Sequence, residues 1–213
     1  MRIGRLHILT DTSSQNRFGH AELAEQAIRG GAEAIQFRQK SGSTQEMIRE
    51  AQRVRAVCRR SNIPLLINDR VDVAIAADAD GVHLGRDDFP IRLARLLLGP
   101  HRIIGGSAGT IEEALAGLRE GADYLGCGPV FTTKTKADAG AAAGPALIRE
   151  LSRAVSIPVL GIGGIDASNA REVIEAGAYG VAVVAAVCTS PDPEEATRQI
   201  RRALDETIGQ RGS

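Results

Sequence analysis

The feature that most constrains this chain is a regular alternation of short apolar runs with longer amphipathic segments. Aliphatic and β-branched runs occur at residues 6–10, 34–38, 65–68, 81–84, 103–106, 124–126, 159–161 and 180–184. Segments of helical length separate them, which is typical of repeated βα units around a parallel sheet. Eight such units in 213 residues predict an α/β fold with a single closed (β/α)8 TIM barrel rather than an open doubly wound sheet.

Residue types at the ends of the expected helices support this reading. Ser43, Thr110 and Asp192 are each followed three positions later by glutamate, which is the pattern of a helix N-terminus. Glycines follow helical segments at positions 30, 31, 121 and 177 and precede the next strand, as expected of left-handed helix ends. We therefore expect one domain over residues 1–213, with a C-terminal tail that frays from about residue 208.

The charge balance limits the classes of partner. Lys plus Arg number 26 and Asp plus Glu number 26, so no overall field attracts the chain to nucleic acid or to a membrane surface. No apolar run approaches the ~18 residues of a membrane-spanning helix, and we expect a cytoplasmic protein. Cys58, Cys127 and Cys188 form no metal-binding spacing. Small molecules are the expected partners, and a homo-oligomer is compatible with the sequence.

Functional groups of a barrel gather at the carboxyl ends of its strands. After the second apolar run, Gln36, Arg38 and Lys40 alternate with Ile35 and Phe37, so the polar set faces the barrel mouth if the apolar pair meets the helices. Unpaired polar groups in that position cost several kcal/mol each, on the order of the transfer penalty of a buried polar group. An anionic substrate would satisfy them, as would a buried ion-pair network with Glu33 or another carboxylate.

Two carboxylates stand at neighbouring strand ends. Asp69 follows the third apolar run and Asp88 lies in the loop after the fourth. Adjacent strands are about 4.8 Å apart, so both residues can reach one Mg2+ whose shell is completed by water and substrate oxygens. The alternative is that these residues, with Asn68 and Asp87, cap the helices that follow. His83 is interpreted as a core histidine with one satisfied nitrogen.

The later strand ends offer hydroxyls, glycines and lysines. Ser107 follows the fifth run, and Thr133, Thr135 and Lys136 follow the sixth, where they are placed to hold phosphoryl oxygens. The order of residues is not that of a P-loop. Gly163 and Gly164 after the seventh run, with residues 183–186 after the eighth, occupy the usual phosphate site of a barrel. Simple loops, caps and tight turns are the alternatives.

Several of these segments, in this order, resemble the thiamine-phosphate synthase (thiamine-phosphate pyrophosphorylase) family over nearly the whole chain. The matching segments are Leu9-Thr10-Asp11, Gln36-Phe37-Arg38-Gln39-Lys40, Leu66-Ile67-Asn68-Asp69-Arg70, Asp80-Gly81-Val82-His83-Leu84-Gly85, Gly128-Pro129-Val130-Phe131 with Thr133-Lys134-Thr135-Lys136-Ala137-Asp138, and Gly161-Ile162-Gly163-Gly164-Ile165. The resemblance implies a (β/α)8 enzyme that joins a hydroxymethylpyrimidine diphosphate to a thiazole phosphate with release of pyrophosphate.

The same resemblance implies a role for each matching residue. Gln36 would contact the pyrimidine, Thr133 would lie between the substrates, and Asp69 and Asp88 would hold Mg2+. The diphosphate would be surrounded by Arg38, Lys40, Asn68, Ser107, Thr135 and Lys136, of which Arg38, Lys40, Ser107 and Lys136 are the expected catalytic residues. The thiazole phosphate would be received by Gly164 and the backbone of Val184 and Ala185.

Two positions depart from the family pattern. Gly109 stands where members often carry histidine, and this counts against the related thiazole tautomerases. Ala185 stands where members often carry serine, which removes a hydroxyl from the thiazole-phosphate site. The alternatives to the synthase are a non-catalytic thiamine-phosphate-binding regulator and a tautomerase on the same barrel.

Overall fold

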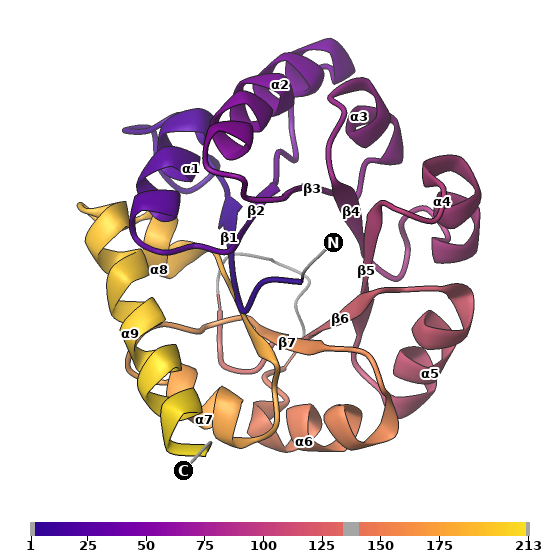
Figure 1. Ribbon diagram of the computed structural model, residues 1–213, viewed down its shortest axis with the longest axis vertical. Coiled ribbons are helices and arrows are strands. Elements are labelled where there is room, and N and C mark those ends of the chain that lie inside the picture. The colour runs from indigo at the N-terminus through magenta and orange to yellow at the C-terminus, as the bar shows by residue number, and fades with distance from the viewer. Residues whose placement is uncertain (1–2, 134–140, 212–213) are drawn as a thin grey trace.

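A computed structural model describes residues 3–133 and 141–211 of the chain. Eight parallel strands pair in sequence order, and β1 also pairs with β8, so the sheet is a closed barrel (Figure 1). The strands are β1 (Leu6–Thr10), β2 (Ala34–Phe37), β3 (Leu65–Asn68), β4 (Gly81–Leu84), β5 (Ile103–Ala108), β6 (Tyr124–Cys127), β7 (Val159–Ile162) and β8 (Gly180–Val183). The predicted (β/α)8 barrel is confirmed.

Helices surround the barrel (Figure 1). They are α1 (His20–Arg29), α2 (Thr44–Arg60), α3 (Val71–Ala76), α4 (Ile91–Leu98), α5 (Ile111–Glu120), α6 (Gly144–Ala154), α7 (Ala170–Glu175), α8 (Ala185–Cys188) and α9 (Pro193–Arg211). Among the residues that the structure describes, none of these helices is both long and apolar enough to cross a membrane.

The predicted helix starts are confirmed by hydrogen bonds. The side chains of Ser43, Thr110 and Asp192 accept from the backbone N–H three residues later, at 3.2, 3.2 and 2.9 Å. Helix α9 continues to Arg211, past position 208 where the sequence predicts fraying, and Ile208 packs against the core.

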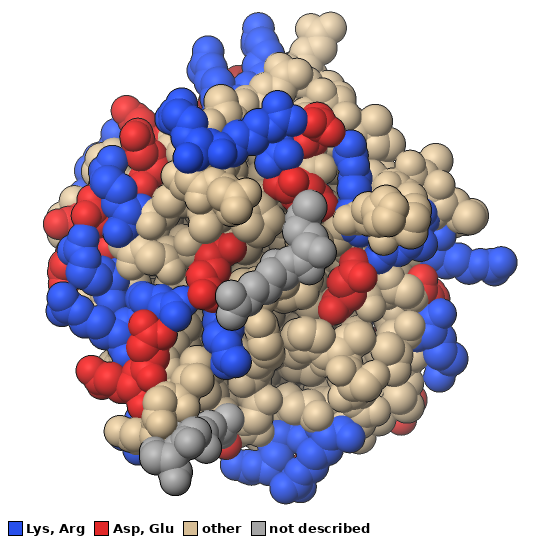
Figure 2. All heavy atoms as spheres, in the orientation of Figure 1, with Lys and Arg blue, Asp and Glu red and all other residues tan. Residues whose placement is uncertain are grey.

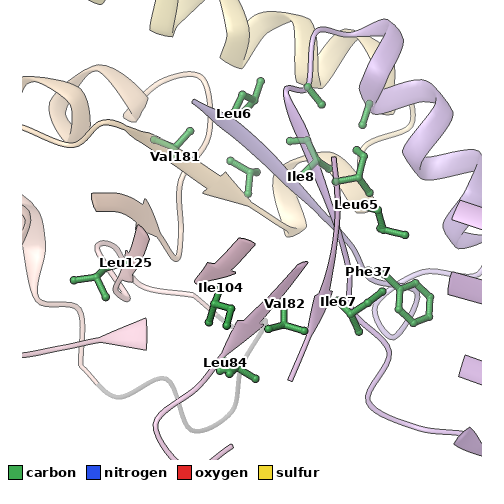
Figure 3. Packing of buried hydrophobic residues seen from close by; sticks show 14 of the residues in the cluster. Leu6, Ile8, Phe37, Leu65, Ile67, Val82, Leu84, Ile104, Leu125 and Val181 are labelled. Carbon is green, nitrogen blue, oxygen red and sulfur yellow. The ribbon is translucent and has the colours of Figure 1, made fainter. Parts of the chain in front are cut away.

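Two apolar layers follow from the alternation of side chains along the strands. The larger cluster lies between the barrel and its helices and includes Ile35, Phe37, Ile67 and Val82. Phe37, Ile67 and Val82 are labelled in Figure 3. A smaller cluster of Leu66, Ile103, Tyr124 and Leu160 comes from strand positions of the opposite parity, which point into the barrel. The predicted outward orientation of Ile35 and Phe37 is therefore confirmed.

The end of the barrel where the strands begin is held by ion pairs. Figure 2 looks onto this end, where acidic and basic side chains lie interspersed. Carboxylates that precede strands bind arginines from the helices, as in the pairs Arg55–Asp80 at 2.6 Å, Arg95–Asp123 at 2.7 Å and Arg201–Glu33 at 2.7 Å. The candidate site residues lie at the opposite end, where the strands terminate.

Candidate active site

The Arg38 guanidinium is held by the carboxylate of Asp11, the residue that follows β1. Only 11% of the Arg38 side chain and 4% of the Asp11 side chain are exposed. Ser13 donates to the other Asp11 oxygen from its backbone N–H at 2.8 Å and its hydroxyl at 2.6 Å. Burial alone would raise the pKa of Asp11, but the Ser13 hydrogen bonds and the Arg38 charge outweigh it and lower that pKa.

The sequence left two partners open for the polar residues of the second strand, a carboxylate in an ion pair or an anionic substrate. The ion pair with Asp11 shows that the first is present, and Arg38 can still bind the second. Arg38 does pair with a carboxylate, but with Asp11 and not with Glu33, which binds Arg201 on the opposite end of the barrel. A guanidinium has five N–H donors in a planar fork. The pair with Asp11 uses only the Nη1 atom of Arg38 and leaves other N–H donors for an anion.

Gln36 is buried, with 2% of its surface exposed, and its Oε1 atom has no hydrogen-bond partner in the described structure. It lies two residues before Arg38 and points to the inside of the barrel. A buried acceptor without a donor costs about 1–3 kcal/mol. A ligand that brings an N–H donor to this oxygen would remove that cost.

Asp69 follows β3 in a left-handed backbone conformation, with φ of 67°. Its N–H donates to the His83 carbonyl at 2.8 Å, and its carboxylate binds the half-exposed Lys40 ammonium. Non-glycine residues adopt this conformation rarely, and when they do it is often at functional sites. Asn68, the residue before it, ends β3 opposite His83.

Asp88 lies in the loop after β4, where its Oδ2 accepts from the Gly85 N–H at 2.7 Å. Burial and the neighbouring Asp69 carboxyl raise the pKa of Asp88, while the Gly85 N–H and the Lys40 charge oppose the rise. Helices α3 and α4 begin after Arg70 and Pro90 without a side-chain cap. The capping alternative is therefore wrong for both aspartates, which instead lie side by side.

Asp69 and Asp88 are the two carboxylates at this position. Among the residues that the structure describes, no third His, Cys, Asp or Glu side chain joins them in a group suited to a metal. Carboxylate oxygens are the ligands that Mg2+ prefers, and Mg2+ usually binds one or two of them with water and substrate phosphates in the other positions. The carboxylates of Asp69 and Asp88 match this pattern of two protein ligands.

His83 joins two other inward-facing side chains. Its Nδ1 lies 3.0 Å from the Tyr124 hydroxyl and its Nε2 lies 3.1 Å from the Ser107 hydroxyl. Space for the two rings comes from Gly105 and Gly126, where a Cβ atom would lie 2.2 Å from Tyr124 Cζ and 2.9 Å from His83 Cε1. Both ring nitrogens of the partly buried His83 have hydrogen-bond partners, where the sequence predicted a core histidine with one, and its partner Ser107 is one of the predicted substrate ligands.

The loop after β7 packs against the chain that follows β6. The N–H groups of Val130 and Phe131 donate to Ile162 and Gly163 at 2.9 and 3.0 Å. Gly164 has φ of 65°, and a Cβ there would lie 2.6 Å from the Thr132 carbonyl oxygen. Gly163 and Gly164 form a turn that holds residues 130–132 against the β7 loop, and their predicted role as a phosphate site stays a prediction.

The remaining predicted residues fall into two groups. Thr133 lies directly after this packed segment, and Val184 and Ala185 follow β8 at the start of α8. Thr135 and Lys136 lie outside the described residues. The strand ends thus bring together Gln36, Arg38, Lys40, Asp69 and Asp88 from β2 to β4, Ser107 from β5, and Gly164, Val184 and Ala185 from β7 and β8.

Sequence reasoning missed two residues of this arrangement. Asp11 was recognisable only as a carboxylate at the end of the first strand, and no role followed from that position. Tyr124 resembled an ordinary core residue. A usable signal was the glycine at position 105, which pairs with Tyr124 in the parallel register and leaves space beside it.

Comparison with known proteins decides the family. The model of the family described as thiamine monophosphate synthase matches residues 6–187. This chain belongs to the thiamine monophosphate synthase family. It is 53% identical over 203 residues to the thiamine-phosphate synthase of Salinibacter ruber, covering 95% of this chain and 89% of that protein.

Other members of the thiamine monophosphate synthase family are similar over their whole length. The thiamine-phosphate synthase of Chloroflexus aurantiacus is 48% identical, covering 95% of this chain and 94% of that protein. The solved structure of thiamine phosphate pyrophosphorylase from Pyrococcus furiosus matches with a TM-score of 0.88 at 41% identity, covering 96% of this chain and 97% of that one. The family resemblance noted from the sequence motifs is confirmed.

Proposed function

We propose that this chain is a thiamine-phosphate synthase. It is a transferase that joins 4-amino-2-methyl-5-hydroxymethylpyrimidine diphosphate to 4-methyl-5-(2-phosphoethyl)thiazole and gives thiamine phosphate and pyrophosphate. Family membership and relatives about half identical support this activity. The observation that carries it in the structure is the set of cations and carboxylates at the ends of β2, β3 and β4, which suits a diphosphate.

The proposed reaction is a dissociative substitution. The bond between the pyrimidine methylene and the diphosphate oxygen breaks, the electron pair leaves with the diphosphate, and the aminopyrimidine stabilises the methylene cation. The thiazole nitrogen then donates its lone pair to form the new C–N bond. No general base is needed, so the protein has to neutralise the leaving group and align the two substrates.

Arg38 and Lys40 supply the cations for the leaving group. Arg38 is fixed by the Asp11 carboxylate before substrate binds, so little reorganisation is needed when negative charge moves onto the diphosphate. Lys40 is more exposed and reaches Asp69. Asn68 and Ser107 add neutral donors, and Lys136 and Thr135 remain the predicted contacts from the other side of the diphosphate.

Asp69 and Asp88 are the proposed holders of Mg2+. Burial, and after it the neighbouring Asp69 carboxyl, raise the pKa of Asp88, and a divalent cation would relieve the cost of placing two negative charges there. A bound Mg2+ would add charge neutralisation on the leaving diphosphate. Lys40, hydrogen-bonded to Asp69, keeps this pair partly neutral in the absence of the cation.

The two ring systems are assigned to opposite parts of the site. The unpartnered Oε1 of Gln36 would accept from the exocyclic amino group of the pyrimidine. The N–H groups of Gly164, Val184 and Ala185 would receive the thiazole phosphate, since the first N–H groups of a helix make no bonds within it. Ala185 contributes no hydroxyl, and Thr133 would lie between the substrates.

The direct test is to mix the purified protein with both phosphorylated substrates and Mg2+ and to measure pyrophosphate and thiamine phosphate. Stoichiometric formation of both products is expected. Binding of thiamine phosphate without pyrophosphate release would favour the regulator, and isomerisation of a thiazole phosphate without condensation would favour the tautomerase. Cytoplasmic location and homo-oligomerisation remain predictions from the sequence.

A further inference from the structure

Ser107, a proposed donor to the diphosphate, ends a hydrogen-bonded series inside the barrel whose other two members, Tyr124 and His83, have no role in the proposed reaction. The Tyr124 hydroxyl is 3.0 Å from His83 Nδ1, and His83 Nε2 is 3.1 Å from the Ser107 hydroxyl. Tyr124 is 1% exposed, whereas His83 and Ser107 are only partly buried. The series therefore runs from the apolar interior to the mouth of the barrel.

We propose that Tyr124 and His83 are positioning residues that orient the Ser107 hydroxyl so that its proton is donated to the substrate diphosphate. This inference rests on the proposed function, because it takes Ser107 as a ligand of the diphosphate. A serine hydroxyl both donates and accepts. An anionic oxygen needs the donor, so a site that fixes the direction of this hydroxyl binds the diphosphate more strongly.

The direction of the hydrogen bonds follows from Tyr124. Within the described structure, the only hydrogen bond of its hydroxyl is the one with His83 Nδ1. A buried hydroxyl proton without an acceptor costs about 1–3 kcal/mol, so the Tyr124 O–H donates to Nδ1. Burial also raises the pKa of Tyr124, which keeps the phenol protonated and able to donate.

The tautomer of His83 and the role of Ser107 then follow in turn. A neutral imidazole that accepts at Nδ1 carries its proton at Nε2. The Nε2–H group donates to Ser107 Oγ, so the Ser107 proton cannot be used in that contact and points toward another acceptor.

The ring of His7 packs against Tyr124 with centroids 5.3 Å apart. Burial lowers the pKa of His7 to about 4, so at neutral pH it adds no charge beside the series.

The first measurement requires no variant. In 15N-labelled wild-type protein, the ring nitrogen shifts of His83 report its tautomer, and assignment follows from the signals lost in His83→Gln. We expect His83 with its proton at Nε2. A proton at Nδ1 would overturn the proposal, because Ser107 would then donate to His83 instead of to a ligand.

The second measurement is a double-mutant cycle on kcat/KM for the pyrimidine diphosphate. Tyr124→Phe should lower kcat/KM about 3- to 10-fold, within the range expected of one lost hydrogen bond, and should have no further effect in the Ser107→Ala background. Tyr179→Phe is the matched control, since its hydroxyl donates to the Ile3 carbonyl at 2.9 Å near the opposite end of the barrel. It should leave kcat/KM unchanged.

The outcomes separate this inference from the proposed function. Equal losses from Tyr124→Phe with and without Ser107 would assign Tyr124 a general structural role and overturn the positioning. An unchanged kcat/KM for Ser107→Ala would also overturn it, while pyrophosphate release by the wild type would still support the synthase. A wild type that releases no pyrophosphate would refute the synthase, and the His83 tautomer would still decide the hydrogen-bond direction.

Discussion

Replacing Asp88 by asparagine should stabilise the metal-free protein while removing its response to Mg2+. The substitution preserves the shape of the side chain, and the amide oxygen can still accept from the Gly85 N–H, which lies 2.7 Å from Asp88 Oδ2. What changes is the charge beside Asp69. A substitution that improves stability and abolishes metal binding is the expected signature of a metal site held by repelling carboxylates.

The size of the stabilisation follows from the surroundings of the pair. Two like charges about 4 Å apart repel by about 1 kcal/mol in a water-like dielectric and by about 4 kcal/mol nearer the protein interior. Asp88 is exposed, although its carboxyl is partly desolvated, and Lys40 partly neutralises Asp69, so a figure close to the water-like one applies. We expect a gain of about 0.5–1 kcal/mol, which raises Tm by roughly 1–4 °C for a chain of this length.

The assay is thermal unfolding followed by circular dichroism, first in chelator and then over a Mg2+ series with inorganic pyrophosphate present. The wild type should gain stability as Mg2+ rises, because a ligand that binds only the folded state stabilises it. Asp88→Asn should start higher and gain little. Asp87→Asn, an exposed neighbour with the same change of charge, is the control and should follow the wild type. The reasoning fails if Asp88→Asn is less stable in chelator or keeps the wild-type Mg2+ response.

Four further substitutions test other parts of the structure. Asp11→Ala leaves the Arg38 charge buried and unpaired, and urea unfolding should show a loss of about 3–5 kcal/mol. Because the pKa of Asp11 is lowered from 3.8, its contribution is complete above that value and is lost as pH falls through the folded-state pKa, so Asp11→Asn should unfold with a weaker dependence on acid. Gly105→Ala places a Cβ 2.2 Å from the Tyr124 ring and should cost about 1–3 kcal/mol in the same urea experiment. Lys136→Ala should lower turnover on the order of 10²-fold in a pyrophosphate-release assay, and unchanged turnover would remove Lys136 from the catalytic set.

The barrel was predictable because strand periodicity and helix ends are local properties of the sequence. β1, β3 and β4 begin and end where the apolar runs do. The fifth strand was underestimated, since Ser107 and Ala108 lie among glycines in a stretch whose composition is typical of loops. They remain in the strand because they pair with Gly126 and Cys127 of β6, and this tertiary pairing outweighs weak local propensity.

The sequence was sufficient to predict which site residues lie at the same end of the barrel. It was not sufficient to predict their individual contacts. Strand order places Arg38, Asp11 and Glu33 on neighbouring chain segments, but Asp11 follows a strand and Glu33 precedes one, so they lie at opposite ends. Given a closed barrel, the position of each carboxylate after or before its strand identifies Asp11 as the partner of Arg38. The left-handed backbone of Asp69 and the hydroxyl direction at Ser107 depend on contacts with β4 and β6 that no local pattern encodes.

Gly105 and Gly126 show how the barrel interior and the site constrain each other. Glycine within a strand costs conformational entropy and contributes no side chain to packing. At these positions any Cβ would enter the space of His83 or Tyr124, so filling them would stabilise the isolated strands and displace the rings. Ser107 lies two residues beyond Gly105 on β5 and pairs with Gly126. A substitution that improves strand propensity at either glycine should therefore weaken diphosphate binding through Ser107, although neither glycine touches the substrate.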